Sequence, residues 1–341
     1  MECKALIVAG ASAGGLDALI ALVGGLPHDL PVAVCVVLHI GSRRSLAPLI
    51  LDGAGALPAA HAVDGEAIRP GHIYVAPPDH HLLVESGRLR LSRGPREHST
   101  RPAVDPLFRS AAQDYGPRVI GVVLSGMLDD GTAGLCEIKR HGGITMVQDP
   151  DDARFAGMPR SALNNAPVDH RAAAHAMGAL LARLVRAMDP IPKAPVPRSE
   201  GRPQSSKEGA RMEGDYELNT PVSLTCPECG GALRETTVDS LPYFTCHIGH
   251  RYAADSMDEA QFRMMEHAFG TAVRALNERA ALCGRLAEAA QRKGHALSAQ
   301  RWNNAGHEAR ERAQLLLDFL TRDWLRPPPN SDEEEVEPSS G

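Results

Sequence analysis

A short apolar run leads directly into a glycine-rich loop near the start of the sequence: Ala5-Leu-Ile-Val-Ala-Gly-Ala-Ser-Ala-Gly-Gly15. Continuous apolar runs of this length, rich in Val and Ile, are typical of strands that a parallel sheet buries on both faces. Glycines permit the tight turn that joins such a strand to the helix after it. The stretch therefore predicts an α/β fold with this loop at the carboxyl edge of a sheet.

The same alternation of short apolar runs and longer Ala- and Leu-rich helical patterns continues to about residue 188. The strand candidates are 5–9, 32–38, 72–76, 119–124 and 143–147. A further pair at 81–85 and 88–92, joined by Ser86-Gly87, predicts an antiparallel hairpin. We therefore expect a doubly wound, mostly parallel sheet that is wrapped by helices and accompanied by this hairpin.

The composition changes several times along the chain and predicts five segments. The α/β domain ends where Pro, Ser, Gly and charged residues replace the apolar periodicity, as in a flexible linker. A compact cysteine-containing segment, a pair of amphipathic helices and an acidic, proline-containing tail follow. The predicted boundaries are 1–188 for the α/β domain, 189–220 for the linker, 221–256 for the cysteine module, 257–326 for the helical hairpin and 327–341 for a disordered tail.

The overall composition is that of an ordinary globular protein. The chain has 341 residues, of which 43% are hydrophobic, and a net charge of −6, which gives no reason to expect nucleic-acid binding. No apolar run is long enough for a membrane helix, and the first residues lack a signal-peptide pattern. The seven cysteines resemble no secreted disulfide scaffold. We therefore expect a cytoplasmic protein with reduced thiols and no membrane insertion.

Three polar residues follow three of the predicted strands, namely Ser12, His39 and Asp130. A neutral hydroxyl becomes a good nucleophile when an imidazole takes its proton, and a carboxylate orients that imidazole and stabilises its charged form. Because the carboxyl ends of parallel strands share one edge of a sheet, the three side chains are expected to lie together. The pattern predicts a serine hydrolase with Ser12 as nucleophile, His39 as base and a carboxylate of the adjacent pair Asp129 and Asp130 as its partner.

Other roles for the same residues remain open at this level. The loop matches the G-x-S-x-G nucleophile elbow, but its free N–H groups can bind either an oxyanion or a phosphate. Phosphate binding ranks second, because the loop lacks the third glycine of a dinucleotide fingerprint and the Gly-Lys-Ser/Thr of a P-loop. Singly, Ser12 also suits a tight turn, His39 a strand end and Asp130 a helix N-cap. Their combination favours the hydrolase.

A second set of residues has the spacing of metal ligands. Cys226-x-x-Cys229 is followed by Cys246-x-x-x-His250, which supplies three thiolates and one imidazole for a closed tetrahedral zinc site. The apolar stretch Val238 to Phe244 between the two halves predicts a strand, so the segment is expected to be zinc-ribbon-like. Its small core makes a structural zinc ion a folding requirement. His247 is an alternative fourth ligand, and a set of unligated or redox-active thiols is the competing interpretation.

Six ordered blocks of the α/β domain resemble those of a known family. The blocks are Gly10-Ala-Ser-Ala-Gly-Gly15, Val37-Leu-His-Ile40, Tyr74-Val-Ala-Pro-Pro-Asp-His80, Arg101-Pro-Ala-Val-Asp105, Gly121-Val-Val-Leu-Ser-Gly-Met127 with Asp130-Gly131, and Gln148-Asp-Pro150 with Gly157-Met-Pro159. In this order they resemble the bacterial chemotaxis protein-glutamate methylesterase family, of the CheB type. The likeness covers about residues 4–188 and is far more specific than any single motif.

The resemblance implies roles for particular residues. It assigns the nucleophile, base and orienting aspartate to Ser12, His39 and Asp130, and one backbone oxyanion donor to Met127, with Ala13 matched by position only. The family often has a neutral residue at the position of Asp129, so this extra carboxylate is either a cap or a group that raises the basicity of His39, and the structural role is preferred. No cofactor is expected for catalysis. Family members typically carry an N-terminal receiver domain, which this sequence lacks, so control by phosphorylation of that domain is not expected.

The resemblance also implies a substrate. The expected activity is demethylation of glutamate methyl esters on the helical cytoplasmic region of chemoreceptors, with release of methanol, and also deamidation of receptor glutamines. One alternative is a signalling scaffold that retains the esterase fold, with the C-terminal region recruiting a signalling protein. Another is an esterase that acts on a substrate other than a receptor.

Overall fold

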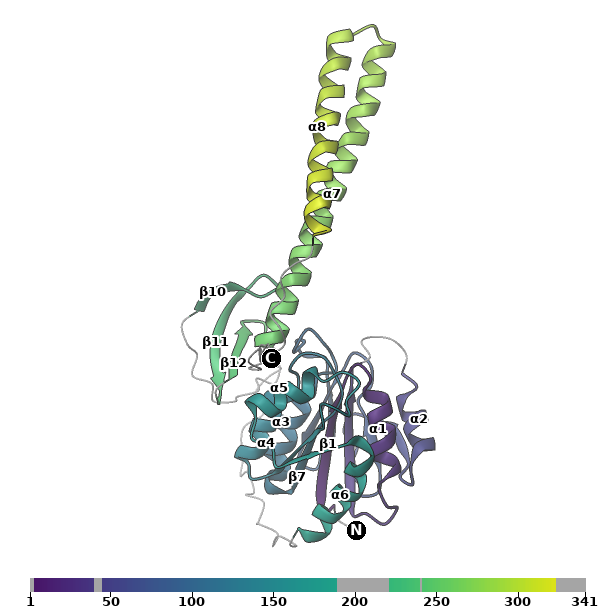
Figure 1. Ribbon diagram of the computed structural model, residues 1–341, viewed down its shortest axis with the longest axis vertical. Coiled ribbons are helices and arrows are strands. Elements are labelled where there is room, and N and C mark those ends of the chain that lie inside the picture. Colours follow the sequence, from purple (N-terminus) through teal and green to yellow (C-terminus); the bar gives the residue numbers. More distant parts are fainter. Residues whose placement is uncertain (1–2, 40–44, 189–220, 240, 323–341) are drawn as a thin grey trace, which may run out of the picture. The chain divides into compact units, whose positions relative to one another are not determined.

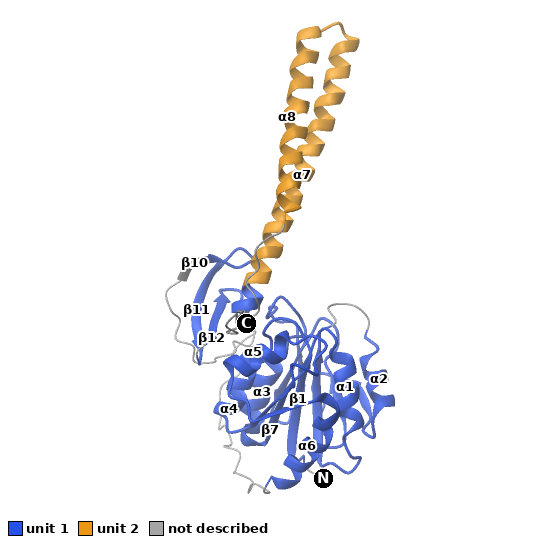
Figure 2. Cartoon of the chain, in the orientation of Figure 1, with its two compact units in different colours: residues 1–257, 329–341 blue, residues 258–328 orange. Residues whose placement is uncertain are grey.

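The computed structural model describes residues 3–39, 45–188, 221–239 and 241–322. The chain divides into two compact units, and the division falls between Met257 and Asp258 in the sequence (Figure 2). The predicted linker at 189–220 and the predicted tail at 327–341 lie outside the described residues, so both stay predictions.

A seven-stranded sheet in which every pairing is parallel forms the centre of the first unit (Figure 1). Its order is β3-β4-β2-β1-β7-β8-β9. The strands are β1 (Ala5–Ala11), β2 (Val32–Leu38), β3 (Ala59–His61), β4 (Ile73–Val75), β7 (Val119–Val123), β8 (Ile144–Gln148) and β9 (His170–Ala172). All five strand candidates are present. The two edge strands β3 and β9 were not predicted, because three residues are too few to carry an apolar pattern.

The predicted hairpin is present as β5 (His81–Glu85) and β6 (Arg88–Ser92), but it forms a two-stranded sheet of its own. Its turn residues Ser86 and Gly87 both have positive φ, as a tight hairpin turn requires. Their N–H groups donate to the two carboxylate oxygens of Asp114, each at 2.8 Å. The hairpin is therefore pinned to a helix rather than added to the central sheet.

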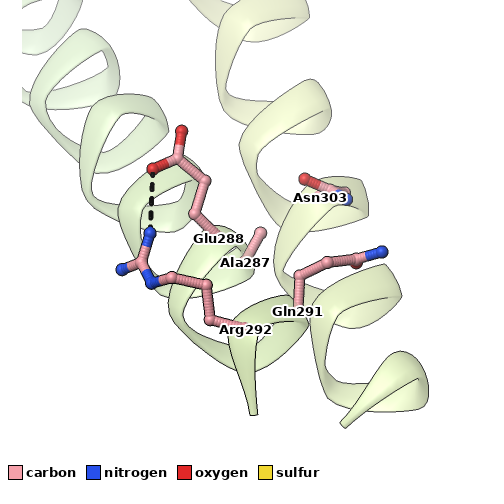
Figure 3. Close-up of a pocket in the computed structure, with 5 residues that line it drawn as sticks. All are labelled: Ala287, Glu288, Gln291, Arg292 and Asn303. Atoms are coloured by element: carbon pink, nitrogen blue, oxygen red, sulfur yellow. Dashed lines mark ion pairs between the residues drawn. The ribbon is translucent and has the colours of Figure 1, made fainter. Parts of the chain in front are cut away.

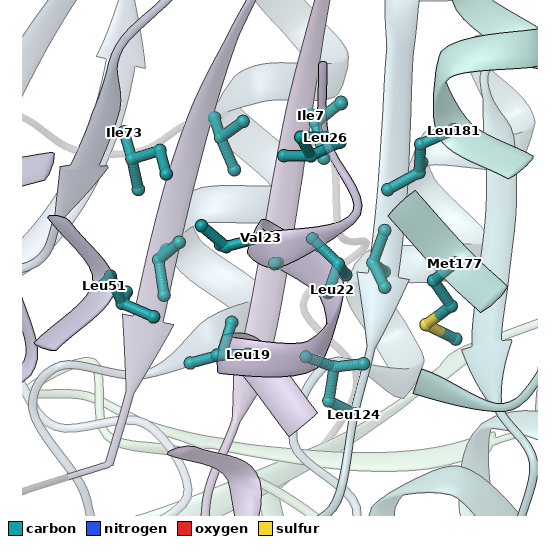
Figure 4. Packing of buried hydrophobic residues seen from close by; sticks show 14 of the residues in the cluster. Ile7, Leu19, Leu22, Val23, Leu26, Leu51, Ile73, Leu124, Met177 and Leu181 are labelled. Atoms are coloured by element: carbon teal, nitrogen blue, oxygen red, sulfur yellow. The ribbon is translucent and has the colours of Figure 1, made fainter. Parts of the chain in front are cut away.

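Helices cover both faces of the sheet, as expected for a doubly wound fold. They are α1 (Gly15–Gly24), α2 (Ala47–Ala54), α3 (Val104–Tyr115), α4 (Thr132–Arg140), α5 (Gly157–Asn165) and α6 (Ala174–Ala187). Successive residues of β1 point to opposite faces: Ile7 packs with Leu19 of α1 and Leu181 of α6 (Figure 4), whereas Leu6 packs with Phe108 of α3. The sheet is thus buried on both sides.

The cysteine module is a four-stranded antiparallel sheet within the first unit. Its strands, in order, are β10 (Pro221–Thr225), β11 (Ala232–Val238), β12 (Leu241–Cys246) and β13 (Arg251–Ala253). The prediction of one strand from Val238 to Phe244 is wrong, because the chain reverses there and Val238 pairs with Leu241. Asp239 takes the positive φ of 54° that this turn needs.

Two long helices follow, α7 (Ala254–Arg292) and α8 (Ala296–Leu320), as the amphipathic pattern predicted. Helix α7 begins at Ala254, earlier than the predicted start at 257. Small buried residues line the contact between the helices, among them Ala280, Cys283 and Gly306. No helix in the described ranges combines the length and the apolarity that crossing a membrane requires.

A pocket lies between the two long helices near the turn that joins them (Figure 3). It is lined by Ala287, Glu288, Gln291, Arg292 and Asn303. Glu288 and Arg292 form an exposed ion pair there at 3.9 Å. Because the lining offers neither a nucleophile nor a histidine, the hydrolytic chemistry has to be sought at the central sheet.

Candidate active site

The three predicted catalytic residues follow the three central strands of the sheet. Strand β1 lies between β2 and β7, so the connections that leave these strands run to opposite sides of the sheet. Open α/β sheets build their binding sites at such a switch point. The N–H of Ser12 donates to the carbonyl of Ser125 at 2.9 Å, and the N–H of His39 donates to the carbonyl of Ala11 at 3.0 Å. These bonds hold the loops together.

His39 and Asp130 form a direct side-chain contact, with Nε2 of His39 2.8 Å from Oδ2 of Asp130. The Asp130 side chain is 2% exposed, and its carboxylate also accepts the N–H groups of Val104 at 2.7 Å and Asp105 at 3.0 Å. Burial disfavours its charge, but the positive charge of His98, the hydrogen bond from His39 and the Val104 N–H together hold the pKa of Asp130 well below its usual range.

The ionised state of Asp130 fixes the tautomer of His39. A carboxylate can only accept hydrogen bonds, so Nε2 of His39 must carry the proton that the pair shares. The lone pair then lies on Nδ1, which is the nitrogen left to take a proton from a nucleophile. This is the reverse of the trypsin-type triad, in which the aspartate binds Nδ1 and Nε2 serves the serine.

Ser12 is half-buried in the loop between β1 and α1. Within the described ranges its hydroxyl makes no hydrogen bond, and none joins it to His39; such contacts often tighten only when substrate binds. The turn after β7 lies against it, because a Cβ on Gly126 would come 2.9 Å from the Cβ of Ser12 and 2.1 Å from Sδ of Met158. Only glycine fits at position 126.

Two backbone donors and two apolar side chains surround this serine. The N–H groups of Ala13 and Met127 have no acceptor among the described residues. The Ser125 hydroxyl donates to the Ala13 carbonyl at 2.8 Å and accepts the N–H of Phe155 at 3.0 Å, so three loops are tied together. The side chains of Met127 and Phe155 are 58% and 39% exposed. Ser12 thus lies near two backbone N–H groups that have no acceptor among the described residues and near an apolar rim formed by Met127 and Phe155.

A buried polar cluster beside Asp130 was missed by the sequence analysis. His98 contacts Asp105, and Arg109 donates to both carboxylate oxygens of Glu97 at 2.6 and 2.8 Å. Asp129, which was given a structural role, accepts backbone N–H groups from the first turn of α7. No local sequence pattern reveals these contacts, because the partners lie far apart in the chain. His98 and Ser256, which also form a hydrogen bond, are 158 positions apart.

The four predicted metal ligands lie together at one end of the cysteine module. Sγ of Cys229 is 3.7 Å from Sγ of Cys246, and Nδ1 of His250 is 3.5 Å from both Cys226 and Cys246. Tetrahedral zinc, with bonds of about 2.3 Å to sulfur and about 2.0–2.1 Å to nitrogen, would put such atoms about 3.6–3.8 Å apart. The donor set therefore fits zinc. The alternative ligand His247 is exposed and stacks on Gly231 instead.

Comparisons with known proteins identify the α/β part of the chain. The family model described as CheB methylesterase matches residues 7–181. A protein-glutamate methylesterase/protein-glutamine glutaminase candidate of Leptospira interrogans is 38% identical over 52% of this chain and 93% of its own length. Relatives of that name from Pyrococcus horikoshii and Chromohalobacter salexigens are 37% and 40% identical, and the chain spans about half of each, 48% and 53%.

A solved structure supports the same assignment. The crystal structure of the Thermotoga maritima CheB methylesterase catalytic domain superposes with a TM-score of 0.51 and 31% sequence identity, over 53% of this chain and 98% of that one. The aligned share corresponds in extent to the α/β part of the chain. With a family model that covers more than half of its residues, the chain belongs to the CheB methylesterase family.

Proposed function

We propose that this chain is a chemotaxis-type protein-glutamate methylesterase in which Ser12 is the nucleophile, His39 the base and Asp130 the partner of His39. The observation that carries the proposal is the contact between Nε2 of His39 and the buried Asp130 carboxylate, at the switch point of the sheet that also carries Ser12. Family membership and the names of the relatives support the reaction class.

The residues suit a two-step acyl transfer. Nδ1 of His39 takes the hydroxyl proton of Ser12 as Oγ bonds to the ester carbonyl carbon, and the resulting oxyanion is stabilised by the N–H groups of Ala13 and Met127. The C–O bond to the methoxy group then breaks, and methanol leaves with the proton from His39. Water attacks the acyl-enzyme by the same route and releases the glutamate carboxylate and free Ser12. An amide side chain would release ammonia instead, which accounts for glutaminase activity.

The surroundings of Ser12 favour a substrate that is presented on a protein surface. A free methyl ester is small, whereas Met127 and Phe155 expose apolar area on the turn after β7 and the loop before α5. Exposed apolar side chains beside a reactive group are suited to contact a partner. We assign this rim to the methylated helical region of a chemoreceptor.

Methanol release from a methyl-esterified receptor fragment tests the proposal. The wild-type chain should release methanol, and Ser12→Ala should lower the rate by at least about 10³-fold, because the nucleophile is lost. Ser298→Ala, a serine exposed on α8, is the matched control and should keep the full rate. Equal release by wild type and Ser12→Ala would reject the proposed nucleophile. Hydrolysis of small esters without receptor demethylation would favour a different substrate.

We further propose that Cys226, Cys229, Cys246 and His250 hold one structural zinc ion, since four protein ligands leave no open position for a substrate. Zinc would supply the cross-link that the small module otherwise lacks. Free thiolates bind zinc in a reducing compartment, which is consistent with a cytoplasmic protein. We also propose that the helical hairpin binds a signalling protein. Capture of that partner by the full chain would test this.

A further inference from the structure

His98 occupies the centre of a group of acidic side chains next to the proposed triad. It lies in the loop between β6 and α3 and is 6% exposed. Its Nε2 is 2.8 Å from Oδ2 of Asp105 and 3.6 Å from Oδ1 of Asp130, and its Nδ1 is 3.4 Å from Oδ1 of Asp129. Three buried carboxylates therefore surround one imidazole.

Each of these carboxylates also accepts N–H groups from the start of a different helix. Asp130 accepts from Val104 and Asp105 of α3, and Asp105 accepts from Gly131 and Gly134 around the start of α4, at 3.1 and 2.7 Å. Asp129 accepts from the first turn of α7, at 2.9 and 3.3 Å. The N-termini of helices favour negative charge, so all three positions suit ionised carboxylates. Three ionised carboxylates this close together need a positive charge between them.

The C-terminal segment holds His98 from the other side. The hydroxyl of Ser256, in the first turn of α7, is 2.8 Å from Nδ1 of His98, and the carbonyl of Arg251 accepts the His98 N–H at 2.7 Å. The edge of the Tyr243 ring faces the imidazole at a centroid distance of 6.0 Å. The φ of His98 is 51°, a conformation that non-glycine residues rarely adopt unless their surroundings enforce it.

We propose that His98 is a positioning residue of the esterase: as an imidazolium held by Ser256, it keeps the neighbouring Asp130 ionised and able to accept the proton of His39. The inference rests on the proposed function of Asp130. It makes the segment from Arg251 to Ser256 part of the support of the active site.

The charge balance explains why the imidazolium is needed. Without it, Asp105, Asp129 and Asp130 would share a proton, because like charges this close cannot all ionise. A protonated Asp130 would donate to Nε2 of His39, so the imidazole proton would move to Nδ1. Nδ1 could then no longer accept the proton of Ser12. In the trypsin-type template, a wrong tautomer of this kind costs about 10⁴-fold in rate.

The electrostatics of the cluster agree with this arrangement. Burial favours the neutral imidazole, yet the charges of Asp130, Asp105 and Asp129 outweigh it and raise the pKa of His98 well above its usual value. The remaining ionisable neighbours are the Tyr243 hydroxyl, whose pKa is raised by burial, and His81, whose pKa is lowered by burial. Glu97 is paired with Arg109 and also interacts with Arg251. The positive charges of Arg109 and Arg251 act on Glu97, whereas His98 is the group that pairs with Asp105, Asp129 and Asp130.

The protonation state of His98 can be read directly in the intact wild-type chain. Long-range ¹H–¹⁵N spectra of histidine-labelled protein should place both ring nitrogens of His98 in the protonated form at pH 7.5. The signal is assigned as the one lost in His98→Gln or, if that variant does not fold, as the one displaced in Ser256→Ala. A neutral His98 at pH 7.5 would overturn the proposal. This readout is independent of whether the chain hydrolyses methyl esters.

Kinetics separate a charge effect from a packing effect. His98→Gln should lower kcat by roughly 10²–10⁴-fold, leave KM unchanged and move the acid limb of the pH profile upward, because Asp130 holds a proton longer. His175→Gln, an exposed position on α6, is the matched control. Adding Asp129→Asn to His98→Gln removes one negative charge while retaining a capping oxygen, and should restore kcat about tenfold. A double variant no faster than His98→Gln would overturn the charge argument.

Discussion

The α/β core and the cysteine module belong to one compact unit but are stabilised in different ways. The core buries continuous apolar strands on both faces of a parallel sheet, with side chains such as Ile7, Leu22 and Phe108 fully enclosed. The module buries few large side chains of its own, and Tyr243 and Leu241 pack instead with Ala133 and Cys136 of the core. Four potential metal ligands lie together in the module, and buried polar contacts from Tyr243 join it to the core.

This difference implies that the α/β core can fold by itself, whereas the cysteine module needs additional stabilisation. A large apolar core provides most of the stability of a domain, whereas a segment of under 40 residues usually needs a metal or a partner surface. The module has a partner surface, and it has four residues that could hold a metal ion. Its partner surface includes the loop that carries Glu97 and His98, so the stability of the module and the geometry of the active site are expected to be coupled.

Loss of the metal should have the largest effect, because structural zinc contributes on the order of 10 kcal/mol to folding of a small module. Cys226→Ser, or a strong chelator, should unfold β10–β13 and leave the parallel sheet intact. Hydrogen exchange resolved by peptide would detect this split, with zinc content measured in parallel. Cys283→Ala, a buried cysteine of α7 outside the cluster, is the control and should retain one zinc. Uniform protection of both regions without metal would contradict the comparison.

Breaking the ion pair under the module should have the next largest effect. Arg109→Met leaves the buried Glu97 carboxylate without its partner and should cost roughly 3–5 kcal/mol. Arg90→Met removes two ion pairs, with Asp64 and Glu85, whose side chains are at least half exposed, and should cost about 0–1 kcal/mol. Chemical denaturation of the two variants gives the difference. Equal costs would mean that the buried pair does not stabilise the interface.

The interface should also weaken at low pH. Burial opposes ionisation of Glu97, but Arg109 and Arg251 outweigh it and lower the pKa of Glu97 to about 2, from its usual value of 4.5. The stability that this carboxylate contributes is therefore present above about pH 4.5 and is lost as the pH falls towards 2. Hydrogen exchange of β12 across that range checks this. Glu97→Gln should flatten the dependence, and Glu266→Gln, an exposed residue of α7, should not.

The smallest effect is expected from glycines within the core helices. A Cβ on Gly53 of α2 meets no atom within 4 Å, so Gly53→Ala should stabilise the core by about 0.5–1 kcal/mol. Gly178 of α6 lies against the backbone of Gly25, where a Cβ would come within 2.5 Å, so Gly178→Ala should destabilise the core. Thermal unfolding measures both. Zinc affinity should be the same in both variants if the module is stabilised separately.

The sequence predicted those features whose cause is local. Five sheet strands were recognised because each is a continuous apolar run, and the positions of Ser12, His39 and Asp130 follow from the ends of such runs. The strand predicted from Val238 to Phe244 was wrong, because its apolar residues continue through a turn at Asp239. The surroundings of His98 could not be predicted, since Asp105, Asp129 and Ser256 come together only in the folded chain.

The adjacent residues Asp129 and Asp130 have a consequence for how this protein could be recombined. Asp129 accepts a hydrogen bond from the start of α7, and Asp130 accepts one from His39. A single loop therefore contacts both the C-terminal extension and a proposed catalytic residue. Grafting the extension onto another hydrolase would require the graft to include Glu97, His98 and Asp129 in the recipient. The C-terminal extension therefore depends on contacts that the α/β part of the chain has to supply.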